Sequence, residues 1–226
     1  MSDSPYVSVL PRSEHRLWRQ SRARLGHLDI ELTERCNNRC IHCLINRPAD
    51  DTTARAAEMD TDFVKDVLRQ AAELGCTSVR FTGGEPLLRD DFETLYLYAR
   101  NLGMKVILFT NGRCITPRLA DLFERVPPGE LIEITAYGMH PQSYEAVTGV
   151  RGAFKEFWAG VELLREHEIP FVVKGCLLPP NRSEMAEYEA LVASLPAMTH
   201  PSYGLVYDLR KRRDDPTKSA RIAKLR

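Results

Sequence analysis

Three cysteines lie within eight residues, in the run Cys36-Asn-Asn-Arg-Cys40-Ile-His-Cys43. Thiolates at this C-x3-C-x2-C spacing can bind the corners of one [4Fe–4S] cluster, and the fourth iron is then left for a substrate or cofactor to coordinate. A zinc ion with His42 as fourth ligand is the alternative, although adjacent side chains such as His42 and Cys43 rarely converge on one ion. A purely structural trio of thiols is a third reading.

A second motif, Gly83-Gly84-Glu85-Pro86, begins about fifty residues after the first cysteine. Its two glycines let a ligand approach the backbone closely, and its carboxylate can meet an ammonium group. The motif by itself is also compatible with an ordinary turn. Its combination with the cysteine spacing favours one composite site.

The elements that must position these residues follow from hydrophobic periodicity, since short β-prone runs alternate with longer segments of helical period. The expected strands are Leu28–Leu32, Ser78–Thr82, Lys105–Phe109, Leu131–Thr135, Phe171–Gly175 and Tyr203–Tyr207. The expected helices lie near Thr61–Leu74, Asp91–Leu102, Thr116–Phe123, Phe154–Glu166 and Ser183–Ala193. Asp60 or Thr61 is expected to cap the first helix, and Gly75 and Gly103 to take left-handed turns after helices.

Six such βα units predict an α/β fold, a partial (β/α)6 TIM-like barrel with parallel strands. Both motifs follow predicted strands, at the carboxyl edge where parallel α/β folds place their sites. The stretch Thr52–Glu58 is expected to belong to a long connection. The domain organisation expected is an N-terminal extension (1–27), a core (28–207) and a basic C-terminal tail (208–226).

The composition excludes several classes of partner. Lysine plus arginine and aspartate plus glutamate each number 31, so charge gives no reason to expect a nucleic-acid partner. No apolar run approaches a membrane span and the N-terminus lacks the apolar core of a secretory signal, so we expect a cytoplasmic protein without a membrane partner. The remaining cysteines are isolated and are expected to be buried, inert thiols: Cys76, Cys114 and Cys176.

The two motifs together resemble the radical S-adenosylmethionine (SAM) superfamily, whose signature is C-x3-C-x-aromatic-C after the first strand and a GGEP-like turn after the second. The resemblance implies that Cys36, Cys40 and Cys43 bind a [4Fe–4S] cluster. It further implies that the amine and carboxylate of SAM chelate the fourth iron, with the amino group received by the turn of Gly83, Gly84, Glu85 and Pro86.

Other contacts implied by the resemblance each have a plain structural alternative. His42 occupies the aromatic position of the signature and could border the adenine. Thr135 matches a position where relatives place a hydroxyl near SAM, and Asn111 lies at the equivalent end of the preceding strand. Thr135 is equally a common strand residue, and Asn111-Gly112 is a common turn pair. Lys174 could point inward or outward, and His140 is a candidate acid or base.

The function implied by the resemblance is reductive cleavage of SAM to a 5′-deoxyadenosyl radical that abstracts hydrogen from a substrate. A one-electron donor of the flavodoxin or ferredoxin type would then be needed. The segment from Tyr137-Gly138 to Phe154 resembles the SPASM-associated subgroup, which favours a peptide or protein substrate.

Two alternatives remain from the sequence: a radical SAM enzyme acting on a small molecule in cofactor or natural-product biosynthesis, and a non-catalytic iron–sulfur or zinc module. The tail resembles the stretch that precedes the cysteine-rich C-terminal extension of the SPASM subgroup, and no such cysteines follow it here, so we expect either a chain that has lost this extension or a shortened one. A partner protein is therefore a candidate for covering the barrel.

Overall fold

A computed structural model describes residues 24–43 and 47–204 of the chain. A six-stranded parallel sheet runs through it in the order β1-β4-β5-β6-β7-β8. Its strands are β1 (His27–Thr33), β4 (Ser78–Gly83), β5 (Lys105–Thr110), β6 (Gly129–Ala136), β7 (Phe171–Cys176) and β8 (Ser202–Gly204). Spatial order follows chain order, which confirms the partial barrel of successive βα units.

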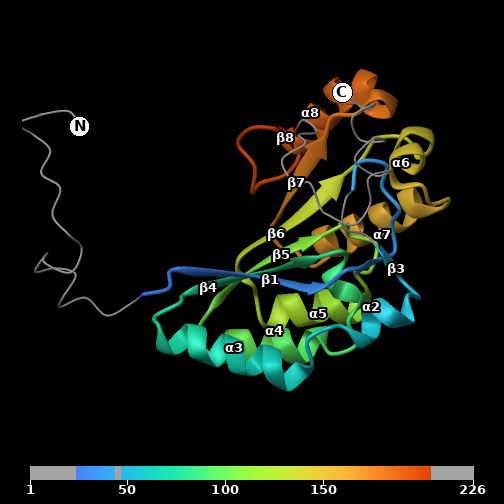
Figure 1. Ribbon diagram of the computed structural model, residues 1–226. Helices are drawn as coiled ribbons and strands as arrows, with labels where there is room; N and C mark the ends of the chain where they lie inside the picture. Colours follow the sequence, from blue (N-terminus) through green and yellow to red (C-terminus); the bar gives the residue numbers. More distant parts are fainter. Residues whose placement is uncertain (1–23, 44–46, 205–226) are drawn as a thin grey trace, which may run out of the picture.

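Helices pack along one face of this curved sheet, as Figure 1 shows for α3, α4 and α5. The helices that follow β1, β4, β5, β6 and β7 are α3 (Thr61–Glu73), α4 (Phe92–Asn101), α5 (Pro117–Arg125), α7 (Ala153–Glu166) and α8 (Met185–Ala193). Alternate strand residues such as Phe81, Leu108 and Ile132 are buried in the core that these helices complete. The residues between them face the other side, because side chains alternate along a strand.

Local signals account for several helix boundaries. The Asp60 carboxylate accepts a hydrogen bond of 2.7 Å from the backbone N–H of Phe63, which caps α3 as expected. Thr116 caps α5 in the same way, and Pro117 occupies the first helical position, where no donor is required. Gly75 and Gly103 have φ angles of +83° and +79°, which confirms the predicted left-handed turns.

The structure also contains short elements that periodicity did not predict. Helix α2 (Thr52–Ala56) interrupts the expected long connection, and helix α6 (Pro141–Thr148) lies where no helix was expected. A two-stranded parallel pair joins β2 (Arg35–Cys36) to β3 (Arg47–Pro48), and two 3-10 helices are η1 (Pro86–Leu88) and η2 (Pro179–Glu184). These elements are too short for the periodicity argument.

Parts of the predicted organisation lie outside the described residues. They are most of the N-terminal extension (1–23), the last residues of the sixth expected strand (205–207) and the basic tail (208–226). Among the helices of the described part, none is both long enough and apolar enough to cross a membrane.

Candidate functional site

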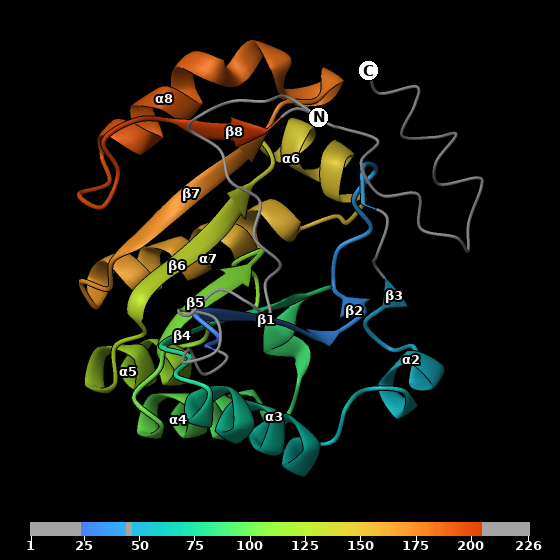
Figure 2. The same cartoon turned by 60° about the vertical axis from the view of Figure 1, so that its left-hand side comes forward.

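The cysteine loop and the glycine-rich turn meet at the carboxyl edge of the sheet. The loop follows β1, the turn follows β4, and Asn111 follows β5. Figure 2 shows these strands side by side in the sheet. Parallel strands bring their carboxyl ends to one edge, so segments distant in sequence become neighbours there.

The two glycines of the turn allow the cysteine-bearing segment to pack directly on it. A Cβ atom on Gly83 would lie 2.3 Å from the carbonyl oxygen of Thr33, and one on Gly84 would lie 2.2 Å from that of Arg35. The backbone N–H of Gly84 donates to Thr33 O at 2.6 Å, and that of Glu85 donates to Arg35 O at 2.8 Å. The turn therefore fixes the chain immediately before Cys36.

Glu85 is fully buried and its carboxylate binds protein donors. Its oxygens accept hydrogen bonds from Thr110 Oγ1 (2.8 Å), Asn111 N (2.8 Å) and Leu87 N (3.1 Å). Burial raises the pKa of Glu85 to about 7, although these hydrogen bonds and the positive charge of Arg113 oppose the rise. The carboxylate thus ties the end of β4 to the end of β5 and orients Asn111.

The thiols lie in a largely buried environment. Asn38 N donates to Cys36 Sγ at 3.4 Å, and Asn111 Nδ2 donates to it at 3.7 Å. Burial raises the pKa of Cys36 to about 12, and the negative charge of Glu85 adds to this rise. Burial also raises the pKa of Cys40, with further contributions from the charges of Cys43 and Cys36. Metal binding must therefore release protons from these thiols.

The three thiols form one donor set. The charges of Cys43 and Cys36 both raise the pKa of Cys40, so the thiols are close enough to influence one another's ionisation. Three thiolates at one site can bind three irons of a [4Fe–4S] cluster and leave the fourth iron for another ligand.

Helix α6 anchors the second half of the cysteine loop. The backbone N–H groups of Arg39 and Ile41 donate to the carbonyl oxygens of Thr148 (2.8 Å) and Val147 (2.9 Å). The Arg39 guanidinium also donates to the carbonyl oxygen of Gly149 at 2.9 Å. These carbonyls are available because the last ones of a helix lack intrahelical partners.

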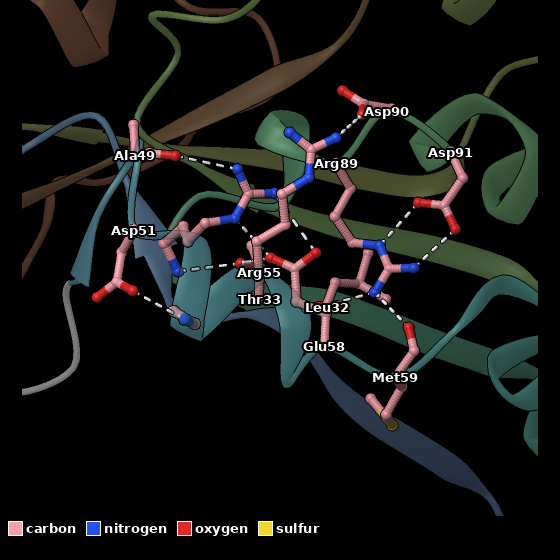
Figure 3. A network of polar contacts seen from close by, with 12 residues as sticks. Leu32, Thr33, Ala49, Asp51, Arg55, Glu58, Met59, Arg89, Asp90 and Asp91 are labelled. Atoms are coloured by element: carbon pink, nitrogen blue, oxygen red, sulfur yellow. Dashed lines mark hydrogen bonds and ion pairs between the residues drawn. The ribbon is translucent and has the colours of Figure 1, made fainter.

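Buried arginines fix the chain that leaves the cysteine loop (Figure 3). Glu58 accepts hydrogen bonds from Thr33 Oγ1 (2.5 Å) and Arg35 Nε (2.7 Å). Arg89 binds both carboxylate oxygens of Asp91 at 2.7 Å and also donates to Leu32 O (3.1 Å) and Met59 O (2.8 Å). Sequence reasoning missed these residues because, apart from the neighbouring pair Arg89 and Asp91, the partners lie 23 to 57 positions apart.

The model of the radical SAM superfamily matches residues 30–192. The chain belongs to the radical SAM superfamily. These enzymes use a [4Fe–4S] cluster and SAM, which confirms the two predicted cofactors.

Two similar proteins are curated enzymes of this kind. The AdoMet-dependent heme synthase of Methanosarcina barkeri (strain Fusaro / DSM 804) is 30% identical over 176 residues, which are 78% of this chain and 49% of that protein. The PqqA peptide cyclase of Gluconobacter oxydans (strain 621H) is 32% identical over 167 residues, which are 74% of this chain and 46% of that protein. The chain therefore spans about half the length of these relatives.

Solved structures share the fold. Streptococcus suis SuiB bound to S-adenosylmethionine superimposes with a TM-score of 0.69 at 16% identity, covering 84% of this chain and 42% of SuiB. SuiB bound to its precursor peptide SuiA gives 0.68 at 18% identity, covering 82% and 40%. These superpositions support the partial-barrel fold of this radical SAM chain.

The inner face of the radical SAM barrel carries Thr135 and a row of charges. Thr135 pairs in register with Lys174, and both alternate with buried core residues such as Val173, so Lys174 points inward. Lys174 Nζ lies 3.8 Å from Glu133 Oε1. Burial raises the pKa of Glu133, and the charge of Lys174 opposes the rise.

A second charge pair lies on the same inner face. Arg80 is paired with Asp29 at 2.9 Å, and its guanidinium carbon lies 4.7 Å from the ring centroid of Phe109. The charge of Arg80, like that of Lys174, opposes the rise that burial causes in the pKa of Glu133. The two pairs therefore belong to one polar row. A molecule within the barrel would meet these side chains.

The other candidate residues have separate environments. The His42 ring lies 5.4 Å from the ring of Tyr137, which is also beside the Cys40 thiol. His140 is exposed and pairs with Glu187 at 2.8 Å.

The isolated cysteines also differ from one another. Cys76 lies in the core and donates to Ser78 O at 3.1 Å, and Cys176 is half-buried. The Cys114 thiol instead accepts a hydrogen bond of 3.3 Å from Asn37 Nδ2, within the cysteine loop. This proximity could not be predicted from spacing, because the two residues are 77 positions apart.

Proposed function

We propose that this chain is the core of a radical SAM enzyme in which Cys36, Cys40 and Cys43 bind the [4Fe–4S] cluster. The observation that supports this proposal most directly is the close packing of the cysteine segment on the glycine-rich turn, where Glu85 N donates to Arg35 O at 2.8 Å. This contact brings the three thiols and the turn to one edge of the sheet, as joint binding of a cluster and SAM requires.

The proposed roles follow from the donors and acceptors that remain available. Cys36, Cys40 and Cys43 would hold the cluster, SAM would complete its coordination, and the turn of Gly83 to Pro86 would receive the amino group of SAM. The Glu85 carboxylate already accepts three hydrogen bonds from the protein, so the backbone carbonyls of the turn are the better acceptors for the ammonium. Asn111, Thr135 and His42 are proposed to contact the remainder of SAM.

The chemistry is supplied by the cofactors when they are bound: one-electron reduction of SAM through the cluster gives methionine and a 5′-deoxyadenosyl radical that removes a hydrogen atom from the substrate. The protein residues position SAM and limit the access of water. The buried surroundings of Cys36 and Cys40 are suited to that second task.

A peptide or protein is the substrate class that we favour. PqqA peptide cyclase is among the similar proteins, and SuiB has been seen with a precursor peptide. A small-molecule substrate is the second candidate, because the heme synthase of M. barkeri is similar over 78% of this chain.

Two partners complete the proposal. A flavodoxin- or ferredoxin-type protein would deliver the electron to the cluster. The inner face of the sheet carries half-exposed side chains such as Lys174, so the substrate or a partner protein would have to cover it during turnover. The ratio of 5′-deoxyadenosine to modified product, measured with and without candidate partner proteins, tests this second role. Tight coupling by the chain alone would contradict it.

Anaerobic reconstitution followed by SAM cleavage tests the proposal. We expect about four irons per chain, and formation of 5′-deoxyadenosine and methionine with dithionite. Replacing Cys36, Cys40 or Cys43 singly by Ala should abolish the SAM-binding cluster, whereas Cys76→Ala and Cys176→Ala should retain it. Zinc without iron would reject the cluster, and a full cluster without 5′-deoxyadenosine would favour the non-catalytic module.

The rate of 5′-deoxyadenosine formation also allows candidate substrates to be compared. A synthetic precursor-type peptide that accelerates 5′-deoxyadenosine formation and gains or loses mass would support peptide modification. Acceleration by a small molecule alone would favour the second candidate.

A further inference from the structure

The loop that follows β5 encloses the middle of the cysteine loop. Asn111 Nδ2 donates to Asn37 Oδ1 at 2.7 Å, and Asn37 Nδ2 donates to Cys114 Sγ at 3.3 Å. Arg113 Nη1 donates to the carbonyl oxygen of Asn37 at 2.5 Å and to Asn38 Oδ1 at 2.6 Å. These four contacts hold the two residues that directly follow Cys36.

Arg113 is the centre of this arrangement. Only 6% of its side chain is exposed, and the remaining guanidinium nitrogens Nε and Nη2 donate to Glu156 Oε2 at 2.8 and 2.6 Å. One planar group therefore bridges the cysteine loop and helix α7. A lysine ammonium is a point charge and cannot span acceptors on both sides in this way.

Helix α7 gives the loop after β5 a rigid support. Gly160 of α7 packs against this loop so closely that a Cβ atom on it would lie 2.1 Å from Gly112 O. Gly112 itself has a φ of +80°, a conformation that favours glycine. The packing of Gly160 and the Arg113–Glu156 pair are therefore two contacts by which α7 fixes this loop.

A loop that carries metal ligands loses conformational freedom when the metal binds. Hydrogen bonds that hold the loop in advance reduce this loss, and they act on ligand residues from outside the metal's own coordination. Residues 37 and 38 lie between the first two cysteines, so holding them sets the separation of Cys36 and Cys40. Within the loop, Arg113 donates to uncharged acceptors. These hydrogen bonds therefore do not require ionised thiols.

We propose that Arg113, oriented by Glu156, is a positioning residue that holds the Cys36–Cys40 loop in its cluster-binding form before the cluster is present. The inference deepens the proposed function, and it rests on that function in taking the ligand of the loop to be the [4Fe–4S] cluster.

Hydrogen exchange in the cluster-free protein tests this directly. The amides of Arg39 and Ile41, which are bonded to α6 carbonyls, report on opening of the loop. We expect Arg113→Ala to raise their exchange rates about tenfold or more, because the loop loses two hydrogen bonds from a buried, charged donor. Arg113→Lys should exchange about as fast as Arg113→Ala. If the lysine variant instead exchanges as slowly as the wild type, the site requires only a positive charge, and the bridging role of Arg113 is wrong.

A matched control and a surface variant make the test independent of global destabilisation. Arg118 forms an exposed pair with Glu93 on neighbouring helices, so Arg118→Ala should leave the exchange of the loop unchanged. Glu156 is 52% exposed, so Glu156→Gln should fold normally while loosening Arg113. We expect it to raise exchange about threefold, an intermediate effect in keeping with the modest contribution of an exposed charge. Unchanged exchange in both Arg113→Ala and Glu156→Gln would overturn the proposal.

The rate of iron loss to a chelator provides the second measurement. Arg113→Ala should lose iron about tenfold faster than the wild type after reconstitution, consistent with the same loosening of the loop. A wild-type protein that takes up no cluster would refute the proposed function, whereas a wild type that binds a cluster no more firmly than Arg113→Ala would refute only the role of Arg113.

Discussion

The two edges of the parallel sheet use glycine for different physical reasons. At the amino edge, Gly75 and Gly103 take positive φ angles, and a Cβ atom on either would meet nothing within 4 Å. At the carboxyl edge, Gly83 and Gly84 would each place a Cβ atom within 2.3 Å of a carbonyl oxygen of the cysteine-bearing segment. Gly75 and Gly103 are needed for the direction of the chain alone, whereas Gly84 is needed for close contact between two segments and Gly83, with a φ of +135°, is needed for both.

Backbone hydrogen bonds join distant segments at both edges, but only the carboxyl edge carries the cysteine loop. At the amino edge, Lys105 N donates to Thr77 O at 2.9 Å and Val106 N donates to Pro128 O at 2.7 Å. At the carboxyl edge, the bonds from Glu85 N to Arg35 O and from Arg39 N to Thr148 O hold the segment that bears the cysteines. Substitutions at the carboxyl edge should therefore change cofactor binding, and those at the amino edge should change only stability.

The largest effect is expected from Gly84→Ala. The new methyl group would overlap the carbonyl group of Arg35, and backbone atoms on both sides must shift to admit it. We expect reconstituted iron to fall to less than about a tenth of the wild-type value, since a displaced Arg35 also displaces the adjacent Cys36. Iron analysis of the folded protein, checked by circular dichroism, measures this. A folded Gly84→Ala protein with full iron content would show that the contact is adaptable and would weaken the comparison.

The next effect concerns the network behind the cysteine loop. Glu58→Ala would leave the guanidinium of Arg35 without its carboxylate partner, and only 6% of the Arg35 side chain is exposed. Loss of one partner of a buried pair is expected to lower the free energy of unfolding by about 3 kcal/mol. Urea denaturation of the cluster-free protein measures this change. Because the pair of Arg55 and Asp90 is exposed, Asp90→Ala serves as a control that should change stability little.

The pH dependence of stability should carry a contribution from Glu85. Burial raises its pKa from 4.5 to about 7, so between these values the native protein retains a proton that the unfolded chain has lost. Glu85 therefore makes its full contribution to the free energy of unfolding below about pH 4.5, and this contribution is lost as the pH rises through 7. The slope of the loss is up to about 1.4 kcal/mol per pH unit. The difference between wild type and Glu85→Gln, followed by thermal unfolding of the cluster-free proteins, should show this slope. A difference that is constant with pH would contradict the assignment.

The sequence predicted the six strands because their residues follow a hydrophobic period. It predicted a site at the carboxyl edge of the sheet because two motifs follow strands. Helix α6 was missed because its buried face includes Ser143 and Thr148 beside Tyr144 and Val147, which breaks the apolar period of an already short helix. The two-residue strands β2 and β3 are too short to show any period.

Several site contacts were beyond prediction for a different reason. Arg113 binds residues 75 and 76 positions away, and the Glu85 carboxylate binds Asn111, 26 positions away. Such pairs depend on the closeness of strand ends, which appears only after the sheet has formed. Sequence motifs therefore indicated the cysteines and the turn but not the side chains that hold them.

The smallest effect is expected at the amino edge, from Gly103→Ala. The methyl group would enter open space, so only the left-handed φ of +79° opposes it. A non-glycine residue in that conformation costs about 1 kcal/mol, and Asn, which tolerates it better, should cost less. Urea denaturation should rank stability as Gly, then Asn, then Ala, while iron content and SAM cleavage stay at the wild-type level in both variants. A loss of cluster binding in Gly103→Ala would mean that strain at the amino edge reaches the site through β5, and the separation of the two edges would then fail.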